Sequence, residues 1–392
     1  MRSRAIALLS AAHLFDDVNQ GVIPALIPFF IAERGFTIAA AAGLVFAGNL
    51  ASSVLQPLFG QLTDRQSAPW LVPGGLLLAG LGVAATGVAP TYALALAAAA
   101  ASGIGVAAFH PEAARQVHAS SGARRGTAMS LFAVGGNLGF AIGPALATPI
   151  QLAWGLRGTI VLVFPAVAMA LVLLLTSRGI SSDEQARRSA VSMPRASDRW
   201  APFSRLTGAV VSRAVVFYGL NTFIPLYWIN VFGRSKGAGA AALTIMLLSG
   251  VAGTLGGGWL ADQIGGRIVV LGSLAALVPL LLAFVSVSSA AVALALLVLI
   301  GLALYAPFSV MTVMGQAYLP SRVGTASGVT IGLAVTLGGL AAPILGRVAD
   351  LHGLRAAVSV LIFVPIVGAL AAWTLPTDRE TFRGETSPNA CE

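Results

Sequence analysis

Charged residues and cysteine are both scarce in this chain, and each scarcity excludes a class of protein. Charged residues make up 9% of the 392 residues, against about 25% in ordinary soluble domains, so a water-soluble fold is excluded. The single cysteine, Cys391, lies near the end of the chain, which excludes a disulfide framework and a CxxC metal site. The chain has no recognisable cleavable signal peptide and no ATP-binding loop, so pumping by nucleotide hydrolysis is not expected.

Apolar residues, by contrast, are abundant. They make up 57% of the chain and the mean hydropathy is +0.87, so most of the chain is expected to lie in a lipid bilayer. The formal net charge is +9, but the arginines are scattered between apolar runs, so nucleic acid is not an expected partner. The sequence therefore predicts an integral membrane protein.

Apolar runs of spanning length follow one another with short polar breaks, and they predict an all-α fold with twelve transmembrane helices. One long polar break divides the spans six and six and is typical of a solvated linker. We predict a six-helix half at 1–177, a cytoplasmic linker at 178–204, a second half at 205–375 and a polar cytoplasmic tail at 376–392. The spans are 5–31, 36–62, 69–89, 92–114, 125–148, 156–177, 205–232, 238–261, 267–287, 290–314, 323–346 and 354–375.

The distribution of basic residues predicts the orientation. With both termini in the cytoplasm, sixteen of the 23 basic residues lie on the inner side and six on the outer side, while Arg213 falls inside a span. Because positive charge collects on the cytoplasmic side of membrane proteins, both termini are expected there.

Two short sequence matches relate the halves. Residues 60–65 and 258–263 each end a predicted span, and residues 126–128 and 324–326 each open one, with an offset of 198 residues in both cases. Two matches at one offset are hard to obtain by chance. They predict two pseudo-symmetric halves built as parallel repeats, an architecture known for transporters.

The first predicted span interrupts the apolar pattern with His13, Asp16, Asp17, Asn19 and Gln20. Asp16 lies twelve residues beyond Arg4, or ~18 Å along a helix, near the middle of a ~30 Å hydrocarbon core. Ionisable groups at that depth are costly unless they face a wet cavity or a partner. We predict that His13, Asp16 and Asp17 take part in proton coupling; the alternative is internal pairing that only holds the helices together.

The fourth span ends in a second polar group. Glu112 and Arg115 lie one helical turn apart and are expected to pair, and Pro111 loosens the helix beside His110. Glu112 is a further candidate for proton coupling, whereas His110, Arg115 and the first span's Gln20 are candidates for substrate binding. The alternative for Glu112 and Arg115 is a lock at the membrane interface.

Arg213 is the candidate that binds an anion. Its guanidinium stays charged at physiological pH and can bind a phosphonate or carboxylate through two hydrogen bonds. The repeat offset maps Arg213 onto Phe15, so we expect it opposite the acidic residues, and Asn221, about two turns later, is a further donor. Protonation of Asp16 or Asp17 would then release Arg213 for the anion. The alternatives are a structural ion pair with an aspartate, or an arginine that reaches back to the inner interface.

A loop pattern provides the first family resemblance. The pattern Gly-x-Leu-x-Asp-x-x-Gly-x-Arg begins at the end of the eighth span, and a copy that lacks the later glycine and basic residues begins at the end of the second. It resembles the signature of the major facilitator superfamily, which implies the fold of that superfamily and a gate on the cytoplasmic side. The gating residues implied are Gly60, Asp64 and Arg65 in the first copy and Gly258, Asp262 and Arg267 in the second.

The fifth span carries Gly135, Gly139 and Gly143-Pro144, which resembles the antiporter signature of the superfamily. Glycines four residues apart give a smooth helix face, and proline permits a bend. The resemblance implies that Gly139, Gly143 and Pro144 act in gating; ordinary helix packing is the alternative.

A narrower resemblance comes from two spans together. His13-x-x-x-Asp17, with Phe109-His110-Pro111-Glu112 in the fourth span, resembles the fosmidomycin resistance proteins, which are bacterial inner-membrane exporters. The similarity runs along most of the chain. It implies efflux of a small phosphonate antibiotic driven by proton entry, a multi-pass protein of the bacterial inner membrane, and, from the superfamily, a monomer.

Proton-coupled antiport of a small anionic organic compound is the function that the sequence favours. Proton-coupled anion uptake stays open, because gradients set the direction, as does divalent-metal transport through the histidines and carboxylates, although Arg213 argues against a cation site. A membrane enzyme would need a nucleophile motif or cofactor loop, and a transport-dead sensor would need a signalling domain. We therefore expect no catalysis, no cofactor and no resident metal, and as partners a small-molecule substrate, protons and the lipid bilayer.

Overall fold

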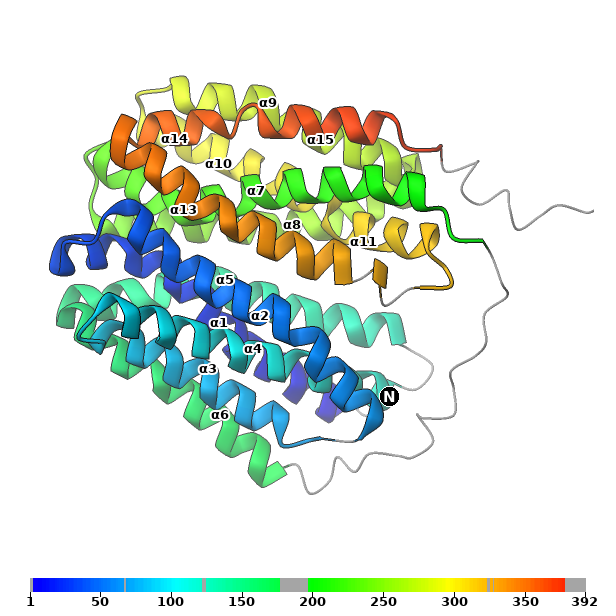
Figure 1. Ribbon diagram of the computed structural model, residues 1–392, viewed down its shortest axis with the longest axis horizontal. Coiled ribbons are helices and arrows are strands. Elements are labelled where there is room, and N and C mark those ends of the chain that lie inside the picture. Colours follow the sequence, from blue (N-terminus) through cyan, green and yellow to red (C-terminus); the bar gives the residue numbers. More distant parts are fainter. Residues whose placement is uncertain are drawn as a thin grey trace, which may run out of the picture. The chain divides into compact units, whose positions relative to one another are not determined.

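The computed structural model is built from helices, with short turns between them (Figure 1). It describes residues 3–66, 68–121, 125–176, 197–322, 325–326 and 328–377, and no strand occurs among them. The helices, in chain order, are α1 (Ser3–Arg34), α2 (Ile38–Arg65), α3 (Leu71–Val88), α4 (Tyr92–Ser121), α5 (Arg125–Trp154), η1 (Gly155–Leu162), α6 (Val163–Thr176), α7 (Trp200–Asn230), α8 (Lys236–Ile264), α9 (Gly266–Ser286), α10 (Ala290–Tyr305), α11 (Pro307–Tyr318), η4 (Gly328–Leu333), α13 (Ala334–His352), α14 (Leu354–Val360) and α15 (Val364–Trp373). The predicted all-α fold is confirmed.

Eleven helical stretches of the described chain are long and apolar enough to cross a membrane. One of them, Ala128–Thr176, is 49 residues long and contains most of both the fifth and the sixth predicted spans. At ~1.5 Å per residue a straight helix of that length would be more than twice as long as a ~30 Å hydrocarbon core is thick. Gly155 interrupts it with a φ of 58°, a conformation that favours glycine. Twelve separate passes stay a prediction.

Three predicted spans are less regular than expected. The span at 290–314 is divided between α10 and α11, because Pro307 has no amide hydrogen to continue the first helix. The span at 354–375 is divided between α14 and α15, with turn residues 361–363 between them. The span at 323–346 begins in the wider turns of η4. A sequence pattern does not reveal these breaks, since prolines also occur inside membrane helices.

The described residues form two compact units. One takes the residues within 1–190, 221–247 and 342–354, and the other those within 191–220, 248–341 and 355–392. Helices α7, α8 and α13 contribute to both units, so the units do not follow the predicted halves, and the division into halves stays a prediction. The greater part of the predicted linker, residues 178–196, and the tail beyond residue 377 lie outside the described residues.

In the first unit, the backbones of α1 and α5 approach each other closely at glycines of α5. A β-carbon added at Gly135 would meet the carbonyl oxygen of Ser10, and one added at Gly139 would meet that of Leu14. Such close approach is possible only with glycine, as in other membrane helix pairs. The surrounding apolar core joins α1, α3, α4, α5 and α6, so α1 is held on several sides by helices of its own unit.

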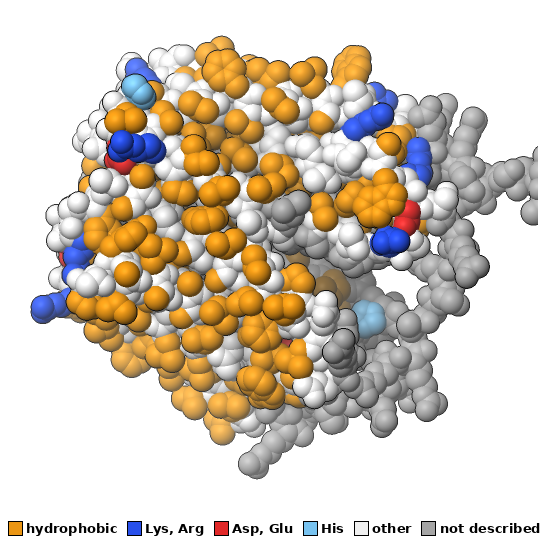
Figure 2. Space-filling model, in the orientation of Figure 1, with side chains coloured by type: hydrophobic (Ala, Val, Ile, Leu, Met, Phe, Trp, Pro, Cys, Tyr) orange, Lys and Arg blue, Asp and Glu red, His pale blue; other side chains and the backbone are white. Residues whose placement is uncertain are grey.

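Apolar side chains are also exposed along the helices, as Figure 2 shows for one face. Leu175 on α6 is 79% exposed, and Val367 and Leu370 on α15 are 65% and 66% exposed. Large exposed apolar side chains in such number are unfavourable in water but suit contact with lipid. The surface therefore agrees with the predicted membrane location.

Candidate functional site

Four ionisable side chains meet between α1 and α4, and we call them the His–Asp cluster: His13, Asp16 and Asp17 of α1 and His110 of α4. His13 Nε2 lies 3.3 Å from Asp17 Oδ2, and His110 Nε2 lies 3.5 Å from Asp17 Oδ1. His110 Nδ1 lies 3.6 Å from Asp16 Oδ2. The two Nε2 atoms are 3.1 Å apart. The cluster therefore brings three predicted proton-coupling residues together with His110, which the sequence predicted to bind substrate.

Helical spacing explains how α1 builds its part of the cluster. His13 and Asp17 are four residues apart and so lie on one face. Gln20, one turn further, donates from Nε2 to Asp17 Oδ1 at 2.7 Å and orients that carboxylate. Asn19 instead donates to the backbone carbonyls of Phe15 and Asp16. Gln20 was predicted to bind substrate, and its observed partner is Asp17.

Helix α5 completes the cluster with two residues that the sequence did not single out. The Phe132 carbonyl oxygen lies 2.7 Å from His13 Nδ1, and the Phe132 ring stacks on the imidazole with centroids 4.0 Å apart. A β-carbon on Gly136 would meet both the His13 ring and the Asp17 carboxylate. The glycine-rich pattern of this span was the available signal, but it does not reveal which helix the glycines face.

Of the two carboxylates in the cluster, Asp16 has fewer stabilising partners than Asp17. It is fully buried, and neither oxygen has a hydrogen-bond partner among the described residues. An ionised carboxylate in such surroundings is costly unless a positive charge accompanies it. The imidazole of His110 is the cationic group within ion-pair distance in the described chain. A proton bound in the cluster would therefore stabilise this arrangement.

Glu112 and Arg115 form a separate pair on α4. Arg115 Nε donates to Glu112 Oε2 at 2.8 Å, and Gln116 donates to Oε1 at 3.0 Å. The predicted pairing across one turn is confirmed. The predicted roles of Glu112 in proton coupling and of Arg115 in substrate binding stay predictions.

Arg213 belongs to the second unit, on α7. Its side chain is buried, its Nε has no hydrogen-bond partner among the described residues, and its guanidinium carbon lies 4.9 Å from the centroid of the Phe308 ring. Asn221 belongs to the first unit, and its side-chain amide is also buried without a partner in the described chain. The unpartnered Nε of this guanidinium is a donor that an anion could use. The predicted position of Arg213 opposite the aspartates stays a prediction.

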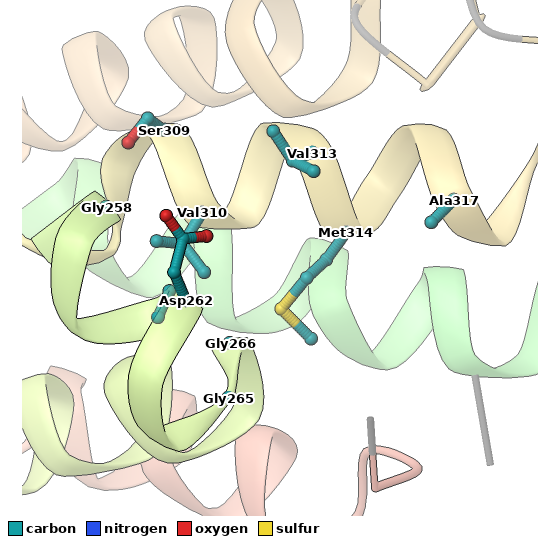
Figure 3. A pocket seen from close by; sticks show the side chains of 10 residues that line it. Gly258, Asp262, Gly265, Gly266, Ser309, Val310, Val313, Met314 and Ala317 are labelled. Atoms are coloured by element: carbon teal, nitrogen blue, oxygen red, sulfur yellow. The ribbon is translucent and has the colours of Figure 1, made fainter. Parts of the chain in front are cut away.

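The second copy of the loop signature lines a cavity of about 410 Å³. Figure 3 shows Asp262 of α8 between Gly258 and the α11 residues Val310 and Met314. Arg267 does not pair with Asp262; it donates to the carbonyl oxygen of Trp373. In the first copy a β-carbon on Gly60 would meet no atom within 4 Å, and the side chains of Asp64 and Arg65 lie outside the described residues. Gating by these residues stays a prediction.

The antiporter-like signature lies in the contact between α5 and α1. Gly143 faces Gly21 of α1, so Gly139 and Gly143 both lie where the two backbones touch. Pro144 follows inside α5. This placement accounts for the glycines by packing, and gating by Gly139, Gly143 and Pro144 stays a prediction.

A contact within the first unit joins helices from the two predicted halves. Asp350 of α13 accepts hydrogen bonds from the backbone amides of Ile38 and Ala39, at 2.8 and 3.1 Å, in the first turn of α2. One turn earlier on α13, a β-carbon on Gly346 would meet the backbone of Ala39. A carboxylate at a helix N-terminus satisfies amides that have no partner inside the helix. We call this the α2–α13 contact.

Replacing Asp350 by asparagine is expected to loosen the start of α2. Asparagine keeps one acceptor oxygen but loses the negative charge that interacts with the helix N-terminus, so exchange of the Ile38 and Ala39 amides should be about two- to fivefold faster. Hydrogen exchange followed by mass spectrometry measures this effect. The Ala40 amide is the internal control, because it donates its hydrogen bond to Thr37 Oγ1 and not to Asp350. Equal acceleration at Ala40 would show general loosening of the helix instead.

The cluster also contains the atoms that could surround a divalent cation. Donor atoms of His13, Asp17 and His110 all lie within 4.8 Å of one another. Imidazole and carboxylate ligands suit zinc or manganese. These side chains have the chemistry to bind either a proton or a divalent metal ion.

Comparison with known proteins identifies the family. The family model of the Major Facilitator Superfamily matches residues 9–343. The chain is 31% identical over 388 residues to the uncharacterized MFS-type transporter YfnC of Bacillus subtilis (strain 168), covering 96% of this chain and 93% of YfnC. It is 32% identical over 382 residues to the fosmidomycin resistance protein of Escherichia coli (strain K12), covering 95% of this chain and 93% of that protein.

A solved structure shows the same fold. The crystal structure of a bacterial homolog to the human lysosomal transporter Spinster, in an inward-facing and occupied conformation, matches with a TM-score of 0.83 and 16% identity and covers 99% of both chains. The helices, the apolar surface and these matches agree. The chain belongs to the Major Facilitator Superfamily of membrane transporters.

Proposed function

We propose that this transporter exports a small anionic organic compound in exchange for protons, with the phosphonate fosmidomycin as the first candidate substrate. The observation that carries the proposal is the buried His–Asp cluster between two helices that can cross a membrane. Ionisable residues at such positions in membrane proteins are typical of proton relays. The similarity to a fosmidomycin resistance protein supports the choice of substrate.

Arg213 supplies the positive charge that the anion requires. Its Nε is unused by any described residue, and a guanidinium can bind two oxygens of a phosphonate at once. Export against a gradient needs an energy source, and a chain without a nucleotide-binding loop depends on an ion gradient. The proton is the ion that buried carboxylates and imidazoles bind.

The test uses proteoliposomes that contain a trapped pH dye, with the membrane potential clamped and no initial pH difference. Fosmidomycin is added outside. Antiport moves the anion in and protons out, so the lumen becomes more alkaline, whereas symport acidifies it. The sign of the dye signal therefore separates export coupling from the uptake alternative. No signal from a folded protein would exclude fosmidomycin as the substrate.

Divalent-metal transport is the second candidate, because three donor atoms converge in the cluster. The same liposomes test it with zinc or manganese outside and a metal-sensitive dye inside. Metal entry that is lost on replacing His110, with no response to fosmidomycin, would favour this candidate. We expect no metal entry, because the positive charge of the buried Arg213 suits an anion and repels a cation.

Replacing Arg213 by alanine is expected to weaken fosmidomycin-dependent proton movement by roughly 10- to 100-fold. A hydrogen bond to a charged group contributes about 1.5–3 kcal/mol to the free energy of binding, and each ~1.4 kcal/mol corresponds to a factor of ten in affinity. Lysine at this position keeps the charge but not the bidentate geometry, so it should restore only part of the signal. Arg205→Ala on the same helix, at an exposed position, is the matched control. Unchanged transport in Arg213→Ala would remove this residue from the substrate site.

A further inference from the structure

We propose that the His–Asp cluster holds one proton shared between His13 and His110, and that this is the proton exchanged for substrate. The first part follows from the geometry of the two imidazoles alone. The second part rests on the proposed function. Neither histidine was expected to act as half of a pair, and His110 was expected to bind substrate.

The outer nitrogen of each ring is fixed as a donor. His13 Nδ1 lies 2.7 Å from the Phe132 carbonyl oxygen, and His110 Nδ1 lies 2.8 Å from that of Val106. A carbonyl oxygen only accepts hydrogen bonds, so each Nδ1 must carry a hydrogen. The nearest carboxylate oxygen to His110 Nδ1, at 3.6 Å on Asp16, is another acceptor. In the neutral form of each ring the lone pair is therefore on Nε2.

The two Nε2 atoms face each other. They are 3.1 Å apart, and the rings are nearly perpendicular, at 88°. This is a hydrogen-bond distance, and a hydrogen bond requires a hydrogen on one of the two atoms. Two neutral rings with hydrogens on Nδ1 would instead bring two lone pairs together. One ring must therefore carry hydrogens on both nitrogens, so the pair holds one proton more than two neutral imidazoles.

The surroundings favour the resulting positive charge. Asp17 lies 3.3 Å from the Nε2 of His13 and 3.5 Å from that of His110, and Asp16 faces the other side of His110. These are the charged groups within ion-pair distance of the two rings in the described chain. On α5, the neighbours of His13 are Phe132 and Gly136, neither of which titrates.

The remaining acidic group nearby does not compete for the proton. Glu112 follows His110 by two residues on α4, but its carboxylate is occupied by Arg115 and Gln116. Phe109 and Phe132 lie against the His13 ring and limit access of water to it. The cluster is thus a site for a single cation, bounded by two carboxylates and two aromatic rings.

Loss of the shared proton has a mechanical consequence. Without it, the two Nε2 lone pairs repel each other, and the rings can no longer stay 3.1 Å apart with both Nδ1 atoms bound to carbonyls. His13 is on α1 and His110 is on α4, so departure of the proton favours separation of these two helices at this point. Proton occupancy and helix arrangement are therefore coupled through a pair of side chains.

Nitrogen NMR of the wild-type protein, labelled with ¹⁵N-histidine and reconstituted in lipid nanodiscs with a chelator present, tests the first part. The chain has four histidines, and His118 and His352 are exposed and serve as internal references. In the substrate-free protein we expect one cluster histidine protonated on both nitrogens and the other on Nδ1 alone. Two cluster rings that each carry only one hydrogen would overturn the proposal.

Variants assign the signals. His13→Asn and His110→Asn should each remove the doubly protonated signal, whereas His352→Asn should leave it unchanged. If either cluster variant does not fold, His118→Asn and His352→Asn assign the two reference signals, and the wild-type spectrum alone then decides the proposal. A ring with a metal ion on Nε2 carries no hydrogen there, so absence of a doubly protonated ring in the chelated sample, with Nε2 signals that shift on adding zinc, would identify a metal site and overturn the proposal.

Addition of fosmidomycin tests the second part in the same sample. If the shared proton is the exchanged one, saturating substrate should convert the doubly protonated ring to the neutral form. An unchanged pair under saturating substrate would separate this proton from transport. The substrate-free spectrum does not depend on the liposome assay. The existence of the shared proton is therefore tested independently of the proposed function.

Discussion

Replacing Asp17 by asparagine is expected to abolish proton-driven transport while leaving substrate exchange intact. Asparagine has nearly the same shape, and its carbonyl oxygen can still accept from Gln20, but it carries no negative charge to stabilise a proton on His13 or His110. Exchange of labelled for unlabelled substrate needs no net proton movement. Asp17→Asn should therefore lose proton-driven transport and keep the exchange of labelled for unlabelled substrate.

Proteoliposomes measure both activities on one preparation: uptake driven by an imposed pH gradient, and counterflow of labelled fosmidomycin without a gradient. Counterflow serves as the control for folding and substrate binding. Asp16→Asn, tested in parallel, shows whether the neighbouring carboxylate has the same role. Full proton-driven uptake by Asp17→Asn would exclude Asp17 from coupling.

Replacing Gly346 by alanine is expected to disrupt the α2–α13 contact and reduce transport by about fivefold or more. The added β-carbon would meet backbone atoms of Ala39, which cannot move aside as a flexible side chain can. Overpacking of this kind costs about 1–3 kcal/mol. The contact joins the two predicted halves, and carriers of this type work by moving one repeat against the other, so the conformation with this contact becomes less populated.

The matched control is Gly256→Ala on α8, where an added β-carbon meets no atom within 4 Å. Initial rates of proton-driven uptake and thermal unfolding in detergent should both be measured. A loss of transport in Gly346→Ala at normal thermal stability, with Gly256→Ala unchanged, supports a role of the contact in the transport cycle. Normal rates in both variants would show that the cycle does not depend on the contact.

Much of the fold could be predicted from sequence because membrane spans are local signals. About twenty apolar residues in a row are long enough to cross the bilayer whatever the rest of the chain does. Polar residues inside a span are equally visible, so Asp16 and Asp17 were recognised directly. The pairing of Glu112 with Arg115 also followed from spacing within one helix.

The partners of these residues could not be predicted, because they depend on which helices touch. His110 joins His13 across 97 residues of sequence, and Asp350 reaches Ile38 across 312. No periodicity links positions that far apart. Phe132 was missed for a further reason: its carbonyl oxygen, a group that every residue has, is the part that contacts His13.

The position of the His–Asp cluster between α1, α4 and α5 also has a consequence for synthesis and membrane insertion. Helix α1 is made before α4 and α5, and the residues of these helices that contact His13 come 97 and 119 residues later. At a translation rate of about 5–20 residues per second, α1 waits roughly 5–25 s before its polar residues find these partners. During that time the span, with two aspartates and a histidine, is poorly suited to free lipid. We therefore expect α1 to stay beside the insertion machinery until α4 and α5 have entered the membrane.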